Sequence, residues 1–278
     1  MTKYTPFVLV LACVVIALLA SLNGDDRAPT TTELTALPPA PFVHRDLRGM
    51  QPNTPRDPAY SPSSAIIAAA TQHETGLWPF GRSWYELAPT DTPPRAIVVL
   101  LHGAGRNGLS LLEMWGATAR QHGLLLVAPN ARGNTWSRDA ADRDFISVAA
   151  RAAAVTHGLA AEGIFLFGHS DGAGMAQEVL NRAEPGLWQA AAVHGGYVEA
   201  SRLRPARTDA PFRMYLGSQD HIFPVEAARM SGETMAYHGH PTELLVIPEH
   251  THWFYEIGPR IAENAWRWFA DVSSRRKD

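Results

Sequence analysis

An apolar run that ends in Gly168-His169-Ser170-Asp171-Gly172 constrains this chain more than any other feature. Residues 163–167 have the composition of a buried parallel strand, and residues 174–182 carry apolar side chains at helical spacing. Gly-x-Ser-x-Gly between a strand and a helix is typical of a turn so tight that only small residues fit on either side of the serine. We therefore expect Ser170 to stand above the sheet edge as a nucleophile.

Strand-like and helix-like segments alternate around this motif. We expect an exposed strand at 83–87, buried strands at 96–101, 124–128, 190–193, 212–217 and 243–248, and helices at 111–122, 140–157 and 261–269. Alternation of this kind predicts an α/β fold with a mostly parallel, doubly wound sheet and helices on both faces.

The strand at 96–101 leads into His102-Gly103-Ala104-Gly105, where small residues let the backbone approach a substrate carbonyl. A His-Gly sequence at this place typically supplies one backbone amide to an oxyanion hole, and the residue after the nucleophile supplies the other. We expect the amides of Ala104 and Asp171 to fill these roles. We expect His102 to brace the loop and to take no part in proton transfer.

An acid and a base follow the next strands. Asp220 comes after the strand at 212–217, and His252 comes after the strand at 243–248. The order Ser170, Asp220, His252 is the chain order of a hydrolase triad on an open α/β sheet. Each residue falls at the carboxyl end of a predicted strand, where such sheets carry their chemistry.

These motifs resemble the α/β-hydrolase superfamily, and within it the polyhydroxybutyrate depolymerase and feruloyl esterase group, near esterase D and S-formylglutathione hydrolase. The likeness covers about residues 83–269 and is carried by residues 101–105, 168–172, 217–220 and 250–255. It implies an α/β-hydrolase fold and a Ser-Asp-His triad.

The group has an Asp-His-x-Tyr-Tyr type motif whose histidine is catalytic, and residues 251–255 match it except at Thr251 and Phe254. The resemblance therefore favours His252 as the base, with His250 as the alternative. Glu226 and Asp209 remain alternatives to Asp220.

Asp171 departs from the group, in which the residue after the nucleophile is more often neutral. A carboxylate that faced a developing oxyanion would oppose the reaction. Two interpretations stay open: the side chain forms a salt bridge or stabilises the first turn of a helix, or it selects substrates that carry a positive or hydroxyl-bearing group.

The predicted function is hydrolysis of carboxylic esters of small or oligomeric substrates through an acyl-enzyme, with no cofactor. A peptidase or a thioesterase on the same fold is the alternative. Two other classes are weaker: a metal-dependent hydrolase that uses the pairs His238/His240 and His250/His252, and a non-catalytic envelope binding protein.

Residues 195–211 are too few for a helical lid domain, so we expect no large lid and an open site. Trp136, Tyr197 and Trp253 fall in loops expected near that site. They are candidates for stacking on an aromatic or sugar ring of the substrate, and core packing is the alternative for each.

The bulk composition excludes some partners. The net charge is −3 and the sequence contains no Lys/Arg cluster, which argues against binding to nucleic acid. The single cysteine, Cys13, lies in the N-terminal apolar segment, so the globular part has neither a disulfide nor a thiolate metal site.

The N-terminal region predicts export. Residues 1–24 read as a signal peptide or membrane anchor, residues 25–64 as a disordered Pro/Thr-rich tether, and residues 65–278 as the α/β-hydrolase domain. We therefore expect a periplasmic or extracellular protein, or one anchored with its domain outside the cytoplasm.

Overall fold

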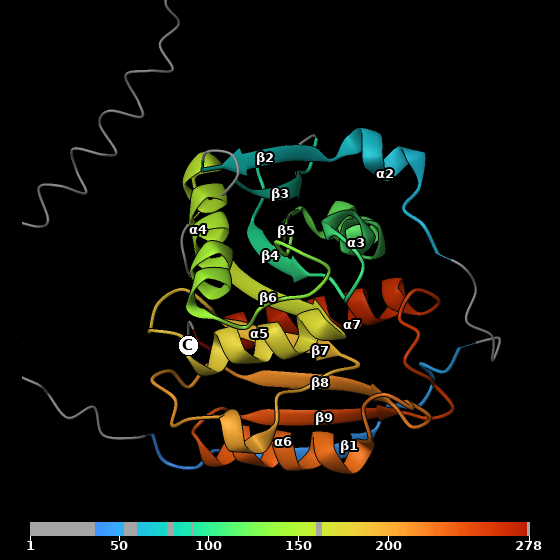
Figure 1. Ribbon diagram of the computed structural model, residues 1–278, viewed down its shortest axis with the longest axis vertical. Coiled ribbons are helices and arrows are strands. Elements are labelled where there is room, and N and C mark those ends of the chain that lie inside the picture. Colours follow the sequence, from blue (N-terminus) through green and yellow to red (C-terminus); the bar gives the residue numbers. More distant parts are fainter. Residues whose placement is uncertain (1–36, 53–59, 77–80, 91, 160–162, 277–278) are drawn as a thin grey trace, which may run out of the picture. The chain divides into compact units, whose positions relative to one another are not determined.

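The computed structural model describes residues 37–52, 60–76, 81–90, 92–159 and 163–276. Within these residues, nine strands form one sheet in the order β1-β9-β8-β7-β6-β4-β5-β3-β2 (Figure 1). The strands are β1 Phe42–Asp46, β2 Thr71–Thr75, β3 Arg82–Leu87, β4 Ala96–Leu101, β5 Leu124–Pro129, β6 Ile164–His169, β7 Ala190–His194, β8 Phe212–Gly217 and β9 Thr242–Ile247.

In the order across the sheet, the seven strands β1, β9, β8, β7, β6, β4 and β5 are parallel to one another. At the far side, β3 runs antiparallel to β5, and β2 runs antiparallel to β3. The central strands β4 to β9 are buried almost throughout, as their unbroken apolar sequences predict. Because parallel strands all end at the same edge, the loops after β4, β6, β7, β8 and β9 come together there. This edge is called the carboxyl edge below.

Helices cover both faces of the sheet. They are α2 Ser64–Ala69, α3 Gly108–His122, α4 Ala140–Thr156, α5 Asp171–Asn181, α6 Val225–Tyr237 and α7 Gly258–Arg275. One core cluster joins α4, α5 and α6 to one face of the sheet, and a second joins α2, α3 and α7 to the other. Alternate residues of β4 enter the two cores, since successive strand side chains point to opposite faces. The predicted doubly wound α/β fold is confirmed.

Local sequence sets the helix ends. The Asn107 side chain accepts a hydrogen bond from the Leu109 amide at 3.2 Å and begins α3, and Gly123 ends it at φ 64°. The Asp139 side chain accepts from the Asp142 amide at 2.9 Å and begins α4. α5 has no such cap, because the turn at Ser170 leads directly into it.

The structure differs from the prediction of a tether over residues 25–64. Residues Phe42–Asp46 form β1, which pairs with β9 along its length, and the Phe42 ring packs against the first core cluster. The folded unit therefore starts before residue 65. The strand predicted at 83–87 exists, but it is not fully exposed, because Trp84 and Glu86 face the interior.

The predicted signal peptide or anchor at residues 1–24 lies outside the described residues. Among the helices that the structure does describe, none is both long and apolar enough to cross a membrane.

Candidate active site

Ser170 occupies a strained turn between β6 and α5. Its backbone lies at φ 55°, ψ −118°, a conformation that costs a non-glycine residue about 1–3 kcal/mol. A Cβ on Gly168 would lie 2.1 Å from the Gly172 carbonyl oxygen, and a Cβ on Gly172 would lie 2.1 Å from that of Leu101. Both motif glycines are thus required by close backbone contacts.

The structure brings Ser170, His252 and Asp220 into one hydrogen-bonded line at the carboxyl edge. His252 Nε2 lies 2.9 Å from Ser170 Oγ, and His252 Nδ1 lies 2.9 Å from Asp220 Oδ2. Since a carboxylate only accepts, Nδ1 carries the proton and Nε2 is free to accept from the serine hydroxyl. Ser170 and His252 keep partial exposure, which leaves them accessible to a substrate.

Asp220 is held as a fixed charge. Its other oxygen, Oδ1, accepts from the amides of Ile222 and Phe223, both at 2.9 Å. Burial raises the pKa of the Asp220 carboxyl, but the hydrogen bonds from His252 and the two amides outweigh burial and keep that pKa below its ordinary value. The carboxylate is therefore ionised at neutral pH and orients the imidazole.

The alternatives to these residues lie elsewhere. His250 is buried with its Nε2 at 2.9 Å from His194 Nε2. Glu226 pairs with Arg229 on α6. Asp209 pairs with Arg276 at the C-terminal end of α7.

Three contacts fix the position of the His252 ring. Phe223 stacks on it with ring centroids 5.5 Å apart, and His169 packs against it at 5.4 Å. Gly195, at φ 60°, passes so close that a Cβ there would lie 3.1 Å from His252 Nδ1. The imidazole is wedged between β6, β7 and the loop after β8.

Two backbone segments lie next to the nucleophile. Asp171 begins α5, and the first amides of a helix have no intrahelical acceptor. The loop after β4 also lies against the serine, since a Cβ on Gly103 would be 3.2 Å from Ser170 Cβ. Ala104 follows Gly103 and is exposed. The amides of Ala104 and Asp171, which were expected to bind an oxyanion, belong to these two segments.

The Asp171 side chain is engaged by the loop that follows β5. Its Oδ2 accepts from the Trp136 backbone amide at 2.6 Å, and its Oδ1 pairs with Arg138 Nη2 at 3.1 Å. Gly174 provides room for that guanidinium, because a Cβ there would lie 2.7 Å from Arg138 Nη2. These contacts favour the salt-bridge interpretation of Asp171.

His102 has the bracing contacts expected of it. Its Nε2 accepts from the Ala131 amide at 3.1 Å, so its Nδ1 carries the proton and donates to the Gly103 carbonyl at 2.8 Å. Burial lowers the pKa of His102, which keeps the ring neutral.

The three candidate stacking residues differ in exposure. Trp136 is only 4% exposed and donates from Nε1 to the His102 carbonyl at 2.9 Å, so its ring is not available to a substrate. The prediction of substrate contact was wrong for Trp136, because this loop folds its indole inward. Tyr197 and Trp253 are half-buried. The Tyr197 ring meets Phe223 edge-on at 5.3 Å, next to His252.

The histidine pairs considered for a metal point to separate partners. His240 Nδ1 lies 2.8 Å from the Ala210 carbonyl. His250 instead contacts His194, and His252 contacts Ser170 and Asp220. Within the described part of the chain, no group of three or more His, Cys, Asp or Glu side chains is arranged to hold a metal ion.

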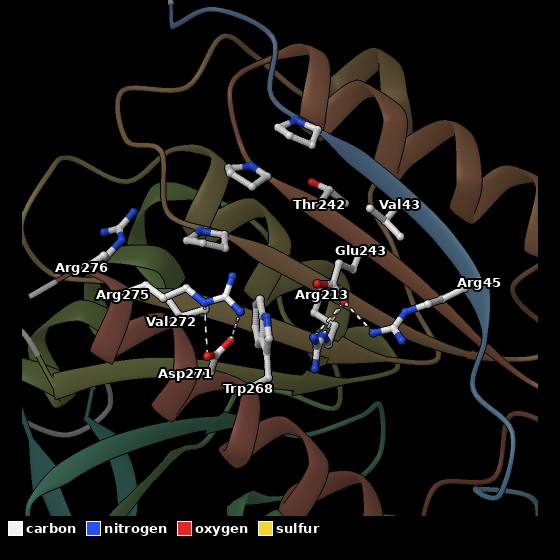
Figure 2. Close-up of a pocket in the computed structure, with 13 residues that line it drawn as sticks. Val43, Arg45, Arg213, Thr242, Glu243, Trp268, Asp271, Val272, Arg275 and Arg276 are labelled. Carbon is white, nitrogen blue, oxygen red and sulfur yellow. Dashed lines mark hydrogen bonds and ion pairs between the residues drawn. The ribbon is translucent and has the colours of Figure 1, made fainter. Parts of the chain in front are cut away.

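A pocket of about 470 Å³ lies at the other edge of the sheet, where β1, β8 and β9 begin (Figure 2). Its rim is rich in arginine, but every one of these arginines already pairs with a carboxylate. The pairs are Arg45 and Arg213 with Glu243, Arg275 with Asp271, and Arg276 with Asp209. This pocket is not part of the site at the carboxyl edge.

Comparison with known proteins agrees with this architecture. The profile of the Dienelactone hydrolase family matches residues 130–272. No curated protein sequence matches the chain.

Three solved structures share the fold. Esterase PE8 superposes with a TM-score of 0.56 at 23% identity and covers 66% of this chain and 97% of its own. An S-formylglutathione hydrolase from Agrobacterium tumefaciens gives 0.60 at 14% identity, over 76% of this chain and 98% of its own. Dienelactone hydrolase from Anabaena variabilis ATCC 29413 gives 0.57 at 19% identity, over 73% and 98%.

Proposed function

Because this chain belongs to the dienelactone hydrolase family of the α/β-hydrolase clan, we propose that it hydrolyses carboxylic esters with Ser170 as the nucleophile. The observation that carries the proposal is the line from Ser170 Oγ through His252 to Asp220, with 2.9 Å at each contact. That line ends at a strained serine, which fits a nucleophile held in position before the substrate arrives.

The first half of the reaction forms an acyl-enzyme. Ser170 Oγ attacks the ester carbonyl carbon while His252 Nε2 takes the hydroxyl proton. Asp220 stabilises the imidazolium through the hydrogen bond at Nδ1. His252 then gives the proton to the leaving alcohol oxygen as the ester C–O bond breaks.

The second half regenerates the serine. Water attacks the acyl carbon as His252 accepts one of its protons. The same proton then returns to Ser170 Oγ when the acid leaves. The tetrahedral oxyanion of each half rests on the amides of Ala104 and Asp171, and each such donor contributes roughly 3 kcal/mol to the transition state.

The surroundings of His252 support a substrate with a small or extended apolar group. The half-buried Phe223 ring stacks on the imidazole and meets the Tyr197 ring edge-on, which gives an apolar ledge beside His252. Ile222, next to Phe223 in the chain, is 53% exposed. Between β7 and β8 the chain forms only the short 3-10 helix Ala200–Arg202, with no lid domain over the ledge. An open ledge suits soluble esters or the ends of oligomeric esters.

The test is a substrate panel. Purified protein is assayed with short p-nitrophenyl esters, hydroxycinnamoyl esters, hydroxybutyrate oligomers, thioesters and peptide amides, beside the Ser170→Ala variant. We expect turnover of at least one class of oxygen ester that Ser170→Ala lacks. Turnover of thioesters or amides alone would replace the ester proposal by the thioesterase or peptidase alternative, and unchanged turnover in Ser170→Ala would reject the nucleophile.

A further inference from the structure

Three buried histidines that the proposed mechanism does not use lie directly behind the candidate triad. His169 ends β6, His194 ends β7, and His250 lies in the loop after β9. They are 5%, 0% and 1% exposed, so bulk solvent does not reach their rings. We call them the histidine chain.

Each ring in the chain contacts the next. His169 Nδ1 lies 3.1 Å from His194 Nδ1, and His194 Nε2 lies 2.9 Å from His250 Nε2. The central imidazole therefore uses both of its nitrogens within the chain. His169 also packs against His252, with ring centroids 5.4 Å apart.

A backbone carbonyl decides which nitrogens carry protons. His169 Nδ1 lies 3.3 Å from the His194 carbonyl oxygen, which can only accept, so His169 Nδ1 carries a hydrogen. That hydrogen also faces His194 Nδ1, which must then be the unprotonated acceptor. His194 consequently carries its proton on Nε2 and donates to His250 Nε2, and His250 carries its proton on Nδ1.

His169 and His194 stay neutral in this arrangement. Burial lowers the pKa of His169 to about 3 and lowers the pKa of His194 well below its ordinary value. A proton added to either ring would place a charge in the core, and a proton added to His194 Nδ1 would also remove the acceptor that His169 uses.

The histidine chain links the segments that carry the proposed triad. The His194 carbonyl accepts from the Ser170 amide at 2.9 Å, so the end of β7 holds the backbone of the nucleophile. The His250 carbonyl accepts from the Gln219 amide at 2.9 Å, next to Asp220. His250 is also only two residues before His252. The single ring of His194 thus connects the serine turn to the segment that carries the base.

We propose that His194 is a positioning residue for the proposed triad: as a neutral imidazole it accepts at Nδ1 from His169 and donates at Nε2 to His250, and it thereby holds Ser170 and His252 in register. This role rests on the proposed function. It acts through the two neighbouring histidines and involves no contact with substrate.

Kinetics of His194 variants of the full chain test the role. His194→Phe keeps the ring volume and removes both hydrogen bonds, and we expect kcat to fall about 10- to 100-fold with KM nearly unchanged. His194→Gln carries an acceptor and a donor on one carbon, as the imidazole does on Cε1, and we expect it to recover most of the loss.

The matched control is His240→Phe. His240 is also fully buried, and its Nδ1 bonds the Ala210 carbonyl at the other edge of the sheet. We expect this variant to lose stability but to keep kcat. A folded His194→Phe with the kcat of the wild type, or an equal loss of kcat in His240→Phe, overturns the proposal.

A second measurement needs neither activity nor a variant. Nitrogen-15 NMR of the wild-type imidazoles at neutral pH distinguishes protonated from unprotonated ring nitrogens. We expect protons on His169 Nδ1, His194 Nε2 and His250 Nδ1. A proton on His194 Nδ1 overturns the positioning role even if the enzyme is active, whereas this pattern in a protein without hydrolase activity rejects the proposed function alone.

Discussion

The Asp171 carboxylate accepts the backbone N–H of Trp136 at 2.6 Å, so the charge beside the nucleophile is bound by the loop after β5. The same loop also contacts the segment after β4, where the Trp136 indole donates to the His102 carbonyl at 2.9 Å. One tryptophan therefore ties together the two segments that carry the proposed oxyanion amides. The acidic residue of the motif, Asp171, thus helps to hold this loop against the site.

Asp171→Asn tests whether the charge itself matters. The amide oxygen still accepts from Trp136, and only the half-buried ion pair with Arg138 is lost. We expect kcat for short esters to stay within about threefold of the wild type and the free energy of unfolding to fall by about 1 kcal/mol. Ester kinetics and urea unfolding measure the two quantities.

Asp171→Ala is the companion variant. It leaves the Trp136 amide without an acceptor, and we expect kcat to fall about 10-fold as the loop shifts. If Asp171→Asn lost activity as completely as Asp171→Ala, the charge would have a role in catalysis or in substrate binding.

The buried histidines predict that acid destabilises the fold. The folded-state pKa of His169 is about 3 and that of His240 about 4, both lowered by burial, while an unfolded histidine titrates near about 6.5. Between these values the unfolded state binds protons that the folded state does not. The stability contribution is therefore complete above about pH 6.5 and is lost as the pH falls toward the folded-state values.

Urea unfolding at a series of pH values measures this effect. We expect the free energy of unfolding to fall from pH 6 to pH 4. We expect His240→Gln to weaken the pH dependence of this free energy by about one proton, which is at most about 1.4 kcal/mol per pH unit. An identical slope in wild type and His240→Gln would show that this imidazole is not excluded from protonation.

The second glycine of the Gly-x-Ser-x-Gly motif, Gly172, is required by backbone contact. A Cβ on Gly172 would lie 2.1 Å from the Leu101 carbonyl oxygen, whereas a Cβ on Gly133 meets nothing within 4 Å. We expect Gly172→Ala to cost about 3 kcal/mol or more, or to prevent folding, and Gly133→Ala to be nearly neutral. Thermal unfolding compares the two variants, and equal melting temperatures would contradict the tight turn.

The first strand belongs to the folded domain. Phe42 packs against the core cluster under α6, and Val43, its neighbour in β1, is 44% exposed. We expect Phe42→Ala to lower the free energy of unfolding by about 2 kcal/mol and Val43→Ala by much less. An unchanged stability in Phe42→Ala would restore the tether interpretation of this segment.

Much of the fold follows from local sequence. The strands β4 and β8 have the bounds that their apolar runs predict, and the turn at Ser170 follows from Gly168 and Gly172. Apolar runs between polar loops identify buried strands because both faces of a parallel sheet are covered. β1 and β2 were missed, since edge strands with exposed faces carry no such pattern.

The site was predictable in part. The motif order placed Ser170, Asp220 and His252 at strand ends that the structure brings together. The partners of Asp171, the inward rotation of Trp136 and the histidine chain depend on how loops from different strands meet. That depends on the register of β6, β7 and β9, which local sequence does not specify.

The most direct test of the account is covalent labelling of the native protein with a fluorophosphonate, read by mass spectrometry of the intact chain and of its peptides. We expect one label per chain on Ser170, none in Ser170→Ala, and much slower labelling in His252→Ala, because the imidazole activates the hydroxyl. A folded wild-type protein that takes up no label, or a label that persists in Ser170→Ala, would contradict the claim that Ser170 is the nucleophile of a serine hydrolase.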